Sequence, residues 1–279
     1  MHGKSEFRQT GRMTRTVLIT GGAGRIGRML LDREPRDGWR YVVLDRDPLD
    51  VDRADVTCVI GSITDPQRVR EAMRGVTDVV HLAGIASEDT WERIGAVNID
   101  GTRNVLEAAA AEGIGRFVFA SSNHAVGLAE IEHGLADDAA PRPDSYYGWS
   151  KAAGEALVRL YCERYGMVGV AVRIGGCSER PASVTRMAVW LSPRDARSLI
   201  DAALENDFGP FAYVWGVSNN TRGWLSRDGA RRIGYEPIDD SEDYRDEIEG
   251  APASRLGGEL GRRELGAPKR SARDVRQGA

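Results

Sequence analysis

The sequence is poor in cysteine and aromatic residues and contains no long hydrophobic run. Its 279 residues include three cysteines, Cys58, Cys162 and Cys177, and 7% aromatic side chains. An odd cysteine count without a C-x-x-C pair argues against a disulfide scaffold or a zinc ribbon. No apolar run approaches the roughly 18 residues of a membrane span, and no signal-peptide pattern follows the N-terminal Met. We therefore expect a cytoplasmic protein with no membrane partner.

Positive charge and lysine are also scarce. Acidic residues number 42 and basic residues 38, for a net charge of −4. Nucleic-acid-binding domains usually carry a basic stripe, so no nucleic-acid partner is expected. The basic residues include only three lysines, and Lys4 and Lys269 lie near the chain ends, so Lys151 is the single lysine of the body. The four histidines show no metal-ligand spacing, and no metal is expected.

Short apolar runs alternate with helical patterns up to about residue 175. The predicted strands are 16–20, 41–45, 57–60, 78–82, 116–120 and 169–173, and the predicted helices cover 26–31, 67–74, 92–112 and 147–165. The apolar runs are continuous rather than alternating, which is typical of strands buried on both faces. The sequence therefore predicts an α/β fold: a Rossmann-type doubly wound parallel sheet with a small C-terminal substrate-binding region.

Changes in composition divide the chain into four parts. Residues 1–13 are polar and aperiodic and are predicted to form a disordered lead. On the motifs described below, residues 14–175 are predicted to form a nucleotide-binding core with the catalytic residues, and 176–250 a substrate-binding region packed on that core. From residue 251 to 279 the chain is rich in Gly, Arg and Ala without apolar periodicity. This end is predicted to be a flexible tail, with docking onto a partner subunit as the alternative.

Three glycines follow the first predicted strand at the spacing G-x-x-G-x-x-G. They are Gly21, Gly24 and Gly27, and the next helix begins among them. Glycine permits a tight turn and a close approach of backbone to a pyrophosphate, and a helix N-terminus offers free N–H groups. A chain with 33 glycines can match this spacing by chance. The position between a strand and a helix favours nucleotide binding.

Asp45 ends the second predicted strand, 18 residues after Gly27. A carboxylate at this position can accept both ribose hydroxyls of NAD and would repel the extra phosphate of NADP. A solvated aspartate at a strand end is the structural alternative, and Arg46 beside it leaves NADP open. We predict NAD as the cofactor.

Tyr147 and Lys151 lie at i and i+4 on one face of a predicted helix. A tyrosine is a poor base at neutral pH, but an adjacent ammonium lowers its pKa. Such a tyrosine can take a proton from a substrate hydroxyl while a hydride leaves the same carbon. A surface Tyr/Lys pair is the common alternative. Position 151 is a lysine in a body that otherwise uses arginine. Because arginine differs from lysine in geometry and donor pattern, this exception favours a chemical role for Lys151.

Polar residues 121–124 (Ser-Ser-Asn-His) follow the fifth predicted strand, at the sheet edge where open α/β sheets bind ligands. A serine hydroxyl there can contact the reacting oxygen, and Asn123 and His124 can hold sugar hydroxyls. An ordinary strand-exit turn would have the same composition.

Together these motifs resemble the extended short-chain dehydrogenases/reductases of the NAD-dependent epimerase/dehydratase superfamily. The matching pieces occur in the family's order: TGGAGRIG at 20–27, Asp45, GSITD at 61–65, HLAG at 81–84, Asn98, ASSN at 120–123 and YGWSK at 147–151. ASSNHAVG at 120–127, RPDSYYGWSK at 142–151, VRIGGC at 172–177, RMAVWLSPRD at 186–195 and VWGVSNN at 214–220 are similar to uronate dehydrogenases and to relatives that oxidise aldoses at C1. The resemblance covers about residues 16–245.

The resemblance implies a role for each matching residue. Tyr147 would be the base, Lys151 its pKa modifier and ribose anchor, and Ser122 the hydroxyl partner. Cofactor contacts would come from Gly21, Gly24, Arg25, Ile26, Gly27, Asp45, Ser62, Ile63, Leu82, Ala83, Gly84, Asn98, Tyr147 and Lys151. Substrate contacts would come from Ser87, Ser122, Asn123, His124, Tyr147 and Arg186, the last gripping a carboxylate.

Three positions depart from the family pattern. Ser62 stands where an adenine-binding aspartate is usual, and Ala86 and Gly176 stand where uronate dehydrogenases have serines facing the substrate. Ser87 is the neighbouring substitute for the serine missing at position 86. Both changes on the sugar side bear on the identity of the substrate.

The resulting hypothesis is an NAD-dependent oxidation of the C1 hydroxyl of galacturonate or glucuronate to an aldarolactone. The first alternative is an NAD-dependent aldose or glucose-6-phosphate 1-dehydrogenase. The second is a nucleotide-sugar epimerase or dehydratase, although roughly 70 residues after Gly175 leave little room for a nucleotide diphosphate. A non-catalytic NAD-sensing protein is a further class, which usually lacks the Tyr/Lys pair. A homo-oligomer formed through a helix pair is expected by analogy.

Overall fold

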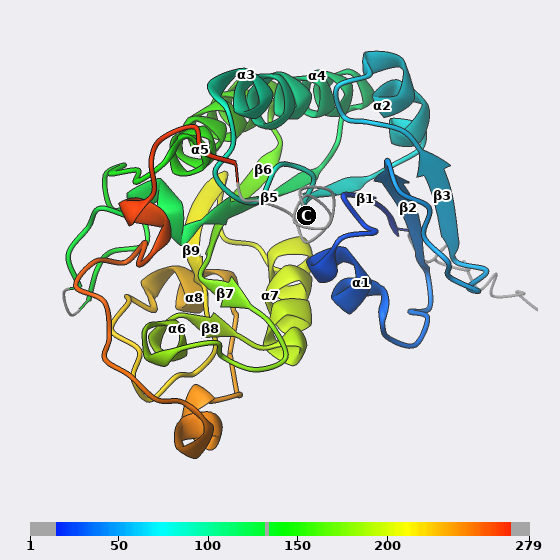
Figure 1. Cartoon of the computed structure of the whole chain (residues 1–279). Coiled ribbons are helices and arrows are strands. Elements are labelled where there is room, and N and C mark those ends of the chain that lie inside the picture. The colour runs from blue at the N-terminus through cyan, green and yellow to red at the C-terminus, as the bar shows by residue number, and fades with distance from the viewer. Residues whose placement is uncertain (1–14, 132–133, 269–279) are drawn as a thin grey trace, which may run out of the picture.

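The computed structural model describes residues 15–131 and 134–268 (Figure 1). Seven parallel strands form the central sheet in the order β3-β2-β1-β4-β5-β6-β9. The strand order reverses between β1 and β4, which pair in parallel with Val17 beside Asp78. In doubly wound sheets this reversal opens a crevice at the carboxyl ends of the strands, where ligands bind. The predicted fold class is confirmed.

The six strands predicted from apolar runs are all present, with ends shifted by no more than two residues. They are β1 (Arg15–Thr20), β2 (Trp39–Asp45), β3 (Val56–Ile60), β4 (Asp78–His81), β5 (Arg116–Ser122) and β6 (Val168–Ile174). Within β1, Val17 and Ile19 pack into the hydrophobic cluster on one face of the sheet, and Leu18 packs into the cluster on the other. Burial on both faces explains the continuous apolar runs.

Helices cover both faces of the sheet. α2 (Pro66–Met73), α4 (Gly101–Glu112) and α5 (Tyr146–Tyr165) form one layer, and α1 (Arg25–Leu31) and α7 (Pro193–Glu205) lie on the opposite face (Figure 1). The start of α2 shows how the local sequence sets a helix end. Asp65 accepts hydrogen bonds from the amides of the second and third helical residues, and proline occupies the first helical position.

The alternation of strand and helix continues beyond residue 175, where the sequence analysis ended it. α7 and β9 (Phe211–Gly216) add a further helix and strand, and β9 pairs in parallel with β6. β9 therefore belongs to the central sheet although it lies in the segment assigned to substrate binding. The rest of that segment forms a small layer below the sheet: β7 (Gly176–Cys177), α6 (Val184–Ala188), β8 (Trp190–Leu191), α8 (Asp228–Ile233) and a 3₁₀ helix, η3 (Ser241–Glu247).

The predicted helix 92–112 contains a π-helical segment. α3 (Trp91–Ile94) is followed without a break by η1 (Gly95–Asp100), which is a π-helix, and then by α4. π-helical turns are rare and occur frequently at functional sites. Here the π-helix carries Asn98, one of the predicted cofactor contacts.

The C-terminal segment differs from the expected flexible tail over its described part, 251–268. Leu256 is buried, and its amide donates to the carbonyl of Ala129 at 3.1 Å. The amide of Gly257 donates to the carbonyl of Gly127 at 2.9 Å, and a short 3₁₀ helix, η4 (Leu260–Arg262), follows. We call residues 251–268 the C-terminal strap. The predicted lead at 1–13 and the last part of the predicted tail, 269–279, lie outside the described residues.

Candidate active site

The glycine loop lies where the strand order reverses. Gly21 has a φ of +73°, and a Cβ atom there would lie 2.7 Å from the backbone nitrogen of Ala83 after β4. A Cβ on Gly27 would lie 2.4 Å from Cα of Gly22, so the first turn of α1 packs directly on the loop. Gly24 is the N-cap of α1, which Arg25 and Ile26 begin. The loop therefore requires glycine for its backbone conformation and for close packing.

Asp45 connects the end of β2 to this loop. Its Oδ2 atom accepts a hydrogen bond from the amide of Ala23 at 2.9 Å, and its Oδ1 atom accepts one from the amide of Asp47 at 3.0 Å. A carboxylate offers about four acceptor positions, so Asp45 retains capacity for two further donors. The aspartate therefore orders the loop, a role that the sequence analysis did not consider.

The next two strand exits carry the other predicted cofactor contacts. After β3, the Ser62 hydroxyl is hydrogen-bonded to the Thr64 hydroxyl at 2.8 Å, and Ile63 is buried against Gly101. After β4, Leu82 and Ala83 lead to Gly84.

Gly84 and the π-helix meet at the N-terminal half of α5. A Cβ atom on Gly84 would lie 3.1 Å from Oδ1 of Asn98 and 3.8 Å from Nζ of Lys151. The Asn98 amide donates to the carbonyl of Ile85 at 3.0 Å and to the hydroxyl of Ser150 at 2.9 Å. Asn98 thus joins the β4 exit to the helix that carries the Tyr/Lys pair.

Tyr147, Lys151 and Ser122 form one buried group. The Lys151 ammonium donates to the carbonyl of Ala120 at 2.7 Å and lies 5.8 Å from the centroid of the Tyr147 ring. Burial lowers the pKa of Lys151 to about 8, and the negative charge of Glu155 opposes this effect. Ser122 ends β5, and its hydroxyl lies close enough to the Tyr147 side chain to lower the pKa of the phenol.

The electrostatics of Tyr147 differ from the sequence-based expectation. Burial raises the pKa of the phenol, while the neighbouring Ser122 hydroxyl and the positive charge of Arg186 lower it. Lys151 was expected to lower this pKa, but its ammonium is directed to the carbonyl of Ala120. Arg186 lies on α6, half-buried, and donates from Nη1 to the carbonyl of Gly175 at 3.2 Å.

Asn123 and His124 continue from Ser122 as a buried 3₁₀ turn, η2 (Asn123–Val126). The Asn123 amide donates to the carbonyl of Leu256 in the C-terminal strap at 3.1 Å. The His124 ring packs edge-on against Tyr147, with 5.7 Å between centroids. Ser87 is half-buried after β4, and in the described part of the chain no hydrogen bond joins its side chain to this group. The geometry thus brings together every predicted polar residue on the sugar side except Ser87.

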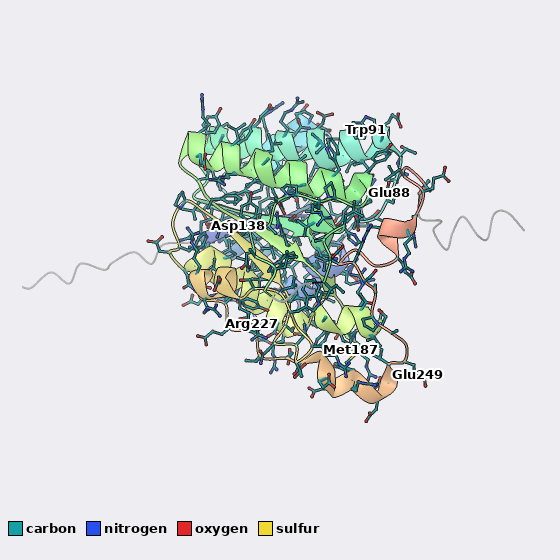
Figure 2. All side chains as sticks on the ribbon, turned by 90° about the vertical axis from the view of Figure 1, so that its left-hand side faces the viewer. Glu88, Trp91, Asp138, Met187, Arg227 and Glu249 are labelled. Atoms are coloured by element: carbon teal, nitrogen blue, oxygen red, sulfur yellow. The ribbon has the colours of Figure 1, made fainter. Side chains whose placement is uncertain are left out.

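Four buried charged residues at the site escaped the sequence analysis. Glu88, which Figure 2 labels near the C-terminal strap, accepts from the amides of Tyr147 at 3.0 Å and Gly266 at 2.8 Å. It therefore binds the start of α5 and the strap together. In the sequence, the only local signal for Glu88 is its position four residues after the glycine of HLAG. Its hydrogen-bond partners, Tyr147 and Gly266, lie 59 and 178 residues away along the chain. The other three are Asp144, Glu155 and Arg173.

Glu155 and Arg173 form an ion pair one helical turn beyond Lys151. The guanidinium donates to both Glu155 oxygens, at 2.9 and 2.8 Å, and the Ser121 hydroxyl donates to Oε1 at 2.5 Å. Both charged side chains are about 1% exposed. The i+4 spacing from Lys151 was a usable signal in the sequence, but the pairing with β6 was not.

Among residues 15–131 and 134–268, no group of three or more His, Cys, Asp or Glu side chains is arranged to hold a metal ion. No helix in these ranges is long and apolar enough to cross a membrane.

A glycine loop at the switch point of a parallel sheet, with a Tyr/Lys pair on α5 facing a serine at the end of β5, defines an enzyme of the extended short-chain dehydrogenase/reductase type. The chain belongs to the NAD dependent epimerase/dehydratase family, whose family model matches residues 17–225. The resemblance identified from the motifs is confirmed.

Individual relatives are similar over most of the chain. An NAD-dependent glucose-6-phosphate dehydrogenase of Haloferax volcanii is 39% identical over 262 residues, covering 86% of this chain and 98% of that protein. A uronate dehydrogenase of Agrobacterium fabrum is 36% identical over 232 residues, covering 83% and 88%.

Solved structures agree with these similarities. A mutant uronate dehydrogenase from Agrobacterium tumefaciens, complexed with NAD, superposes with a TM-score of 0.84 at 33% identity, covering 90% of this chain and 98% of that one. A glucuronic acid dehydrogenase from Chromohalobacter salexigens gives a TM-score of 0.85 at 31% identity, covering 91% and 99%.

Proposed function

We propose that this protein is an NAD-dependent dehydrogenase that oxidises the C1 hydroxyl of a cyclic hexuronate, galacturonate or glucuronate, to an aldarolactone. The observation that carries the proposal is the half-buried Arg186 guanidinium close enough to Tyr147 to lower the pKa of its phenol. A cation beside the proposed base suits a sugar that carries a carboxylate. The named uronate dehydrogenases among the relatives support the same substrate class.

The residues present fit NAD. Gly21 and Gly27 let the loop pack closely against Ala83 and Gly22 at the switch point, and Gly84 leaves space beside Asn98 and Lys151. Asp45 has acceptor capacity left for two ribose hydroxyls. The cofactor would be held by Gly21, Gly24, Arg25, Ile26, Gly27, Asp45, Ser62, Ile63, Leu82, Ala83, Gly84, Asn98, Tyr147 and Lys151. When bound, NAD supplies the acceptor for the hydride that leaves C1.

The chain's own residues handle the proton and the orientation of the sugar. The deprotonated Tyr147 oxygen takes the proton of the C1 hydroxyl as the C1–H bond breaks with loss of a hydride, and the carbonyl of the lactone forms. Ser122 donates its one hydroxyl hydrogen to the reacting oxygen. Arg186 binds the sugar carboxylate through two N–H groups, a geometry that suits guanidinium.

The test is a substrate panel followed by NADH formation. Galacturonate, glucuronate, glucose 6-phosphate and a neutral aldose are each assayed with NAD and with NADP. The Arg186→Met variant is compared with Arg180→Met, because Arg180 is an exposed arginine that pairs with Glu247 away from the Tyr/Lys pair. We expect Arg186→Met to lower kcat/KM for the uronates by about ten- to hundred-fold, the loss of a charge-assisted hydrogen-bond pair, and Arg180→Met to leave it unchanged.

A second candidate is an NAD-dependent glucose-6-phosphate or aldose 1-dehydrogenase. Gly176 favours it, because a Cβ atom there would lie 3.4 Å from Cδ of Arg186 and its absence leaves room beside the guanidinium. The glucose-6-phosphate dehydrogenase relative points the same way. Turnover of glucose 6-phosphate with none of either uronate would replace the uronate assignment and retain the reaction type. Equal losses on charged and neutral sugars in Arg186→Met would remove the proposed role of Arg186.

A further inference from the structure

Asp144 is enclosed by backbone rather than by side chains. It precedes the N-cap of α5, and its side chain is fully buried. Four glycines surround the carboxyl group: Gly127, Gly148, Gly257 and Gly261. A Cβ atom on Gly257 would lie 1.7 Å from Oδ2, and one on Gly127 would lie 2.0 Å from it. The chain therefore closes around this carboxyl group at a distance that only glycine permits, and two of the four glycines belong to the C-terminal strap.

The two carboxyl oxygens of Asp144 have different partners. Oδ1 accepts from the hydroxyl of Ser145 at 2.8 Å, and Oδ2 lies 2.8 Å from Nδ1 of His124. With the Asp144 carboxyl oxygen as the acceptor, Nδ1 of His124 carries the hydrogen of this contact. In a neutral imidazole the other nitrogen, Nε2, is then an acceptor.

Nε2 of His124 is not fully buried. In the described part of the chain, Nε2 of His124 has no hydrogen-bond partner. Tyr41 Oη is the one fully buried side-chain nitrogen or oxygen in that part without a partner, so Nε2 is not among the fully buried atoms. Nε2 is therefore accessible at a surface. The ring packs edge-on against Tyr147, so that surface adjoins the proposed base.

We propose that Asp144 is a positioning residue that holds His124 in the Nδ1–H tautomer, so that Nε2 accepts a hydrogen bond from a hydroxyl of the cyclic sugar held against Tyr147. The proposal rests on the proposed function for the identity of the ligand. It assigns recognition of a hydroxyl donor to this point of the site, in contrast to the carboxylate assigned to Arg186. It also gives the C-terminal strap a part in the site, because Gly257 and Gly261 complete the enclosure of the carboxylate.

The competing explanation is that Asp144 only anchors the strap. Glu88 illustrates such an anchor, since its oxygens accept from backbone amides on α5 and on the strap. Asp144 differs because its partner is an imidazole whose second nitrogen is accessible at a surface. Readouts of the His124 tautomer and of catalysis separate the two explanations.

The first experiment measures the tautomer directly by ¹⁵N NMR of histidine-labelled protein. The chain has four histidines, and His124→Gln identifies the signal of His124. We expect a protonated Nδ1 and an unprotonated Nε2 in the wild type. In Asp144→Asn the Ser145 hydroxyl donates to the amide oxygen, so the amide nitrogen faces Nδ1 of His124. Nδ1 must then accept a hydrogen bond, and the ring hydrogen moves to Nε2. The same reversal occurs when an orienting aspartate becomes asparagine.

A matched control is Asp137→Asn. Asp137 is also buried, but it accepts from the backbone amides of Trp215 and Gly229. It should leave both the His124 signal and kcat/KM unchanged. A wild-type His124 protonated at Nε2, or an unchanged tautomer in Asp144→Asn, would overturn the proposal. This readout needs no substrate, so it stands even if the uronate assignment fails in the substrate panel.

The second experiment is a double-mutant cycle on kcat/KM for whichever sugar the panel identifies. Asp144→Asn should lower kcat/KM by at least about ten-fold with NAD affinity retained, since a hydrogen bond to substrate is lost or reversed. In a His124→Ala background it should have little further effect, because Asp144 acts through His124. If the losses in kcat/KM from Asp144→Asn and His124→Ala multiply in the double variant, and Tm falls in proportion, Asp144 only supports the structure.

Discussion

Replacing Lys151 by methionine should stabilise the folded protein while abolishing its activity. Lys151 is 6% exposed, and burial lowers its pKa from 10.5 to about 8. That difference corresponds to a cost of about 3 kcal/mol at pH 7, where the ammonium is charged in both the folded and the unfolded chain. Methionine removes this cost but leaves the carbonyl of Ala120 without its donor, at about 1 kcal/mol. The net gain at pH 7 is then about 2 kcal/mol.

The stability difference between the wild type and the methionine variant depends on pH. Below pH 8 the lysine is protonated in both states, and the whole cost is present. Between pH 8 and 10.5 the folded protein releases the proton while the unfolded chain keeps it, so the stability of the wild type rises with pH relative to the methionine variant. The cost falls to about 1.5 kcal/mol at pH 9.5, about half its value at pH 7.

Urea denaturation of both proteins at pH 7 and pH 9.5 measures the difference, and NADH formation measures activity. Lys151→Arg is the matched control, because arginine stays charged across this range and its stability relative to methionine should not change with pH. A methionine variant that is less stable at pH 7, or a difference that is independent of pH, would refute the electrostatic reasoning.

Three further changes test other parts of the site. Gly27→Ala forces a Cβ atom against Gly22 and should weaken NAD binding at least about ten-fold in a fluorescence titration, because the loop loses its packing on α1. Asp45→Ala should lower the ratio of kcat/KM with NAD to that with NADP, because the carboxylate that repels the extra phosphate is gone. Glu155→Gln leaves the buried guanidinium of Arg173 without its counter-charge and should cost about 3–5 kcal/mol, or a fall in Tm of about 10 °C, in a thermal melt.

Each of these has a result that contradicts it. Wild-type NAD affinity in Gly27→Ala would mean that the loop does not bind the cofactor. An unchanged cofactor ratio in Asp45→Ala would limit that residue to ordering the loop. For Glu155→Gln the comparison is Glu163→Gln, whose carboxylate pairs with Arg159 at the surface; equal losses in the two would show that burial of the inner pair has no energetic consequence.

The parts predicted from sequence are those whose signal is local. Six strands follow from apolar runs because each is buried on both faces, and the Tyr147/Lys151 pair follows from helical spacing. β9 (FAYVWG) escaped together with the helix before it, although Ser192 caps that helix and proline opens it. Those residues are typical start signals of a helix.

The parts that escaped depend on contacts between distant segments. Glu88 meets amides on α5 and on the strap, and Asp144 is enclosed by glycines from three separate regions. The strap has no apolar periodicity because Leu256 is its one fully buried large side chain and the rest is held by backbone hydrogen bonds. A pattern-based analysis reads such a segment as a tail.

Because lysine is scarce, cleavage at lysine can report local opening of the folded protein. A protease that cleaves only after lysine finds three sites in the chain, at residues 4, 151 and 269. Of these, Lys151 lies within α5, buried against β5, so its peptide bond can reach a protease only when that helix opens. Cutting at this one position would divide the body in two, and the appearance of the two halves would report the opening of the catalytic helix without any label.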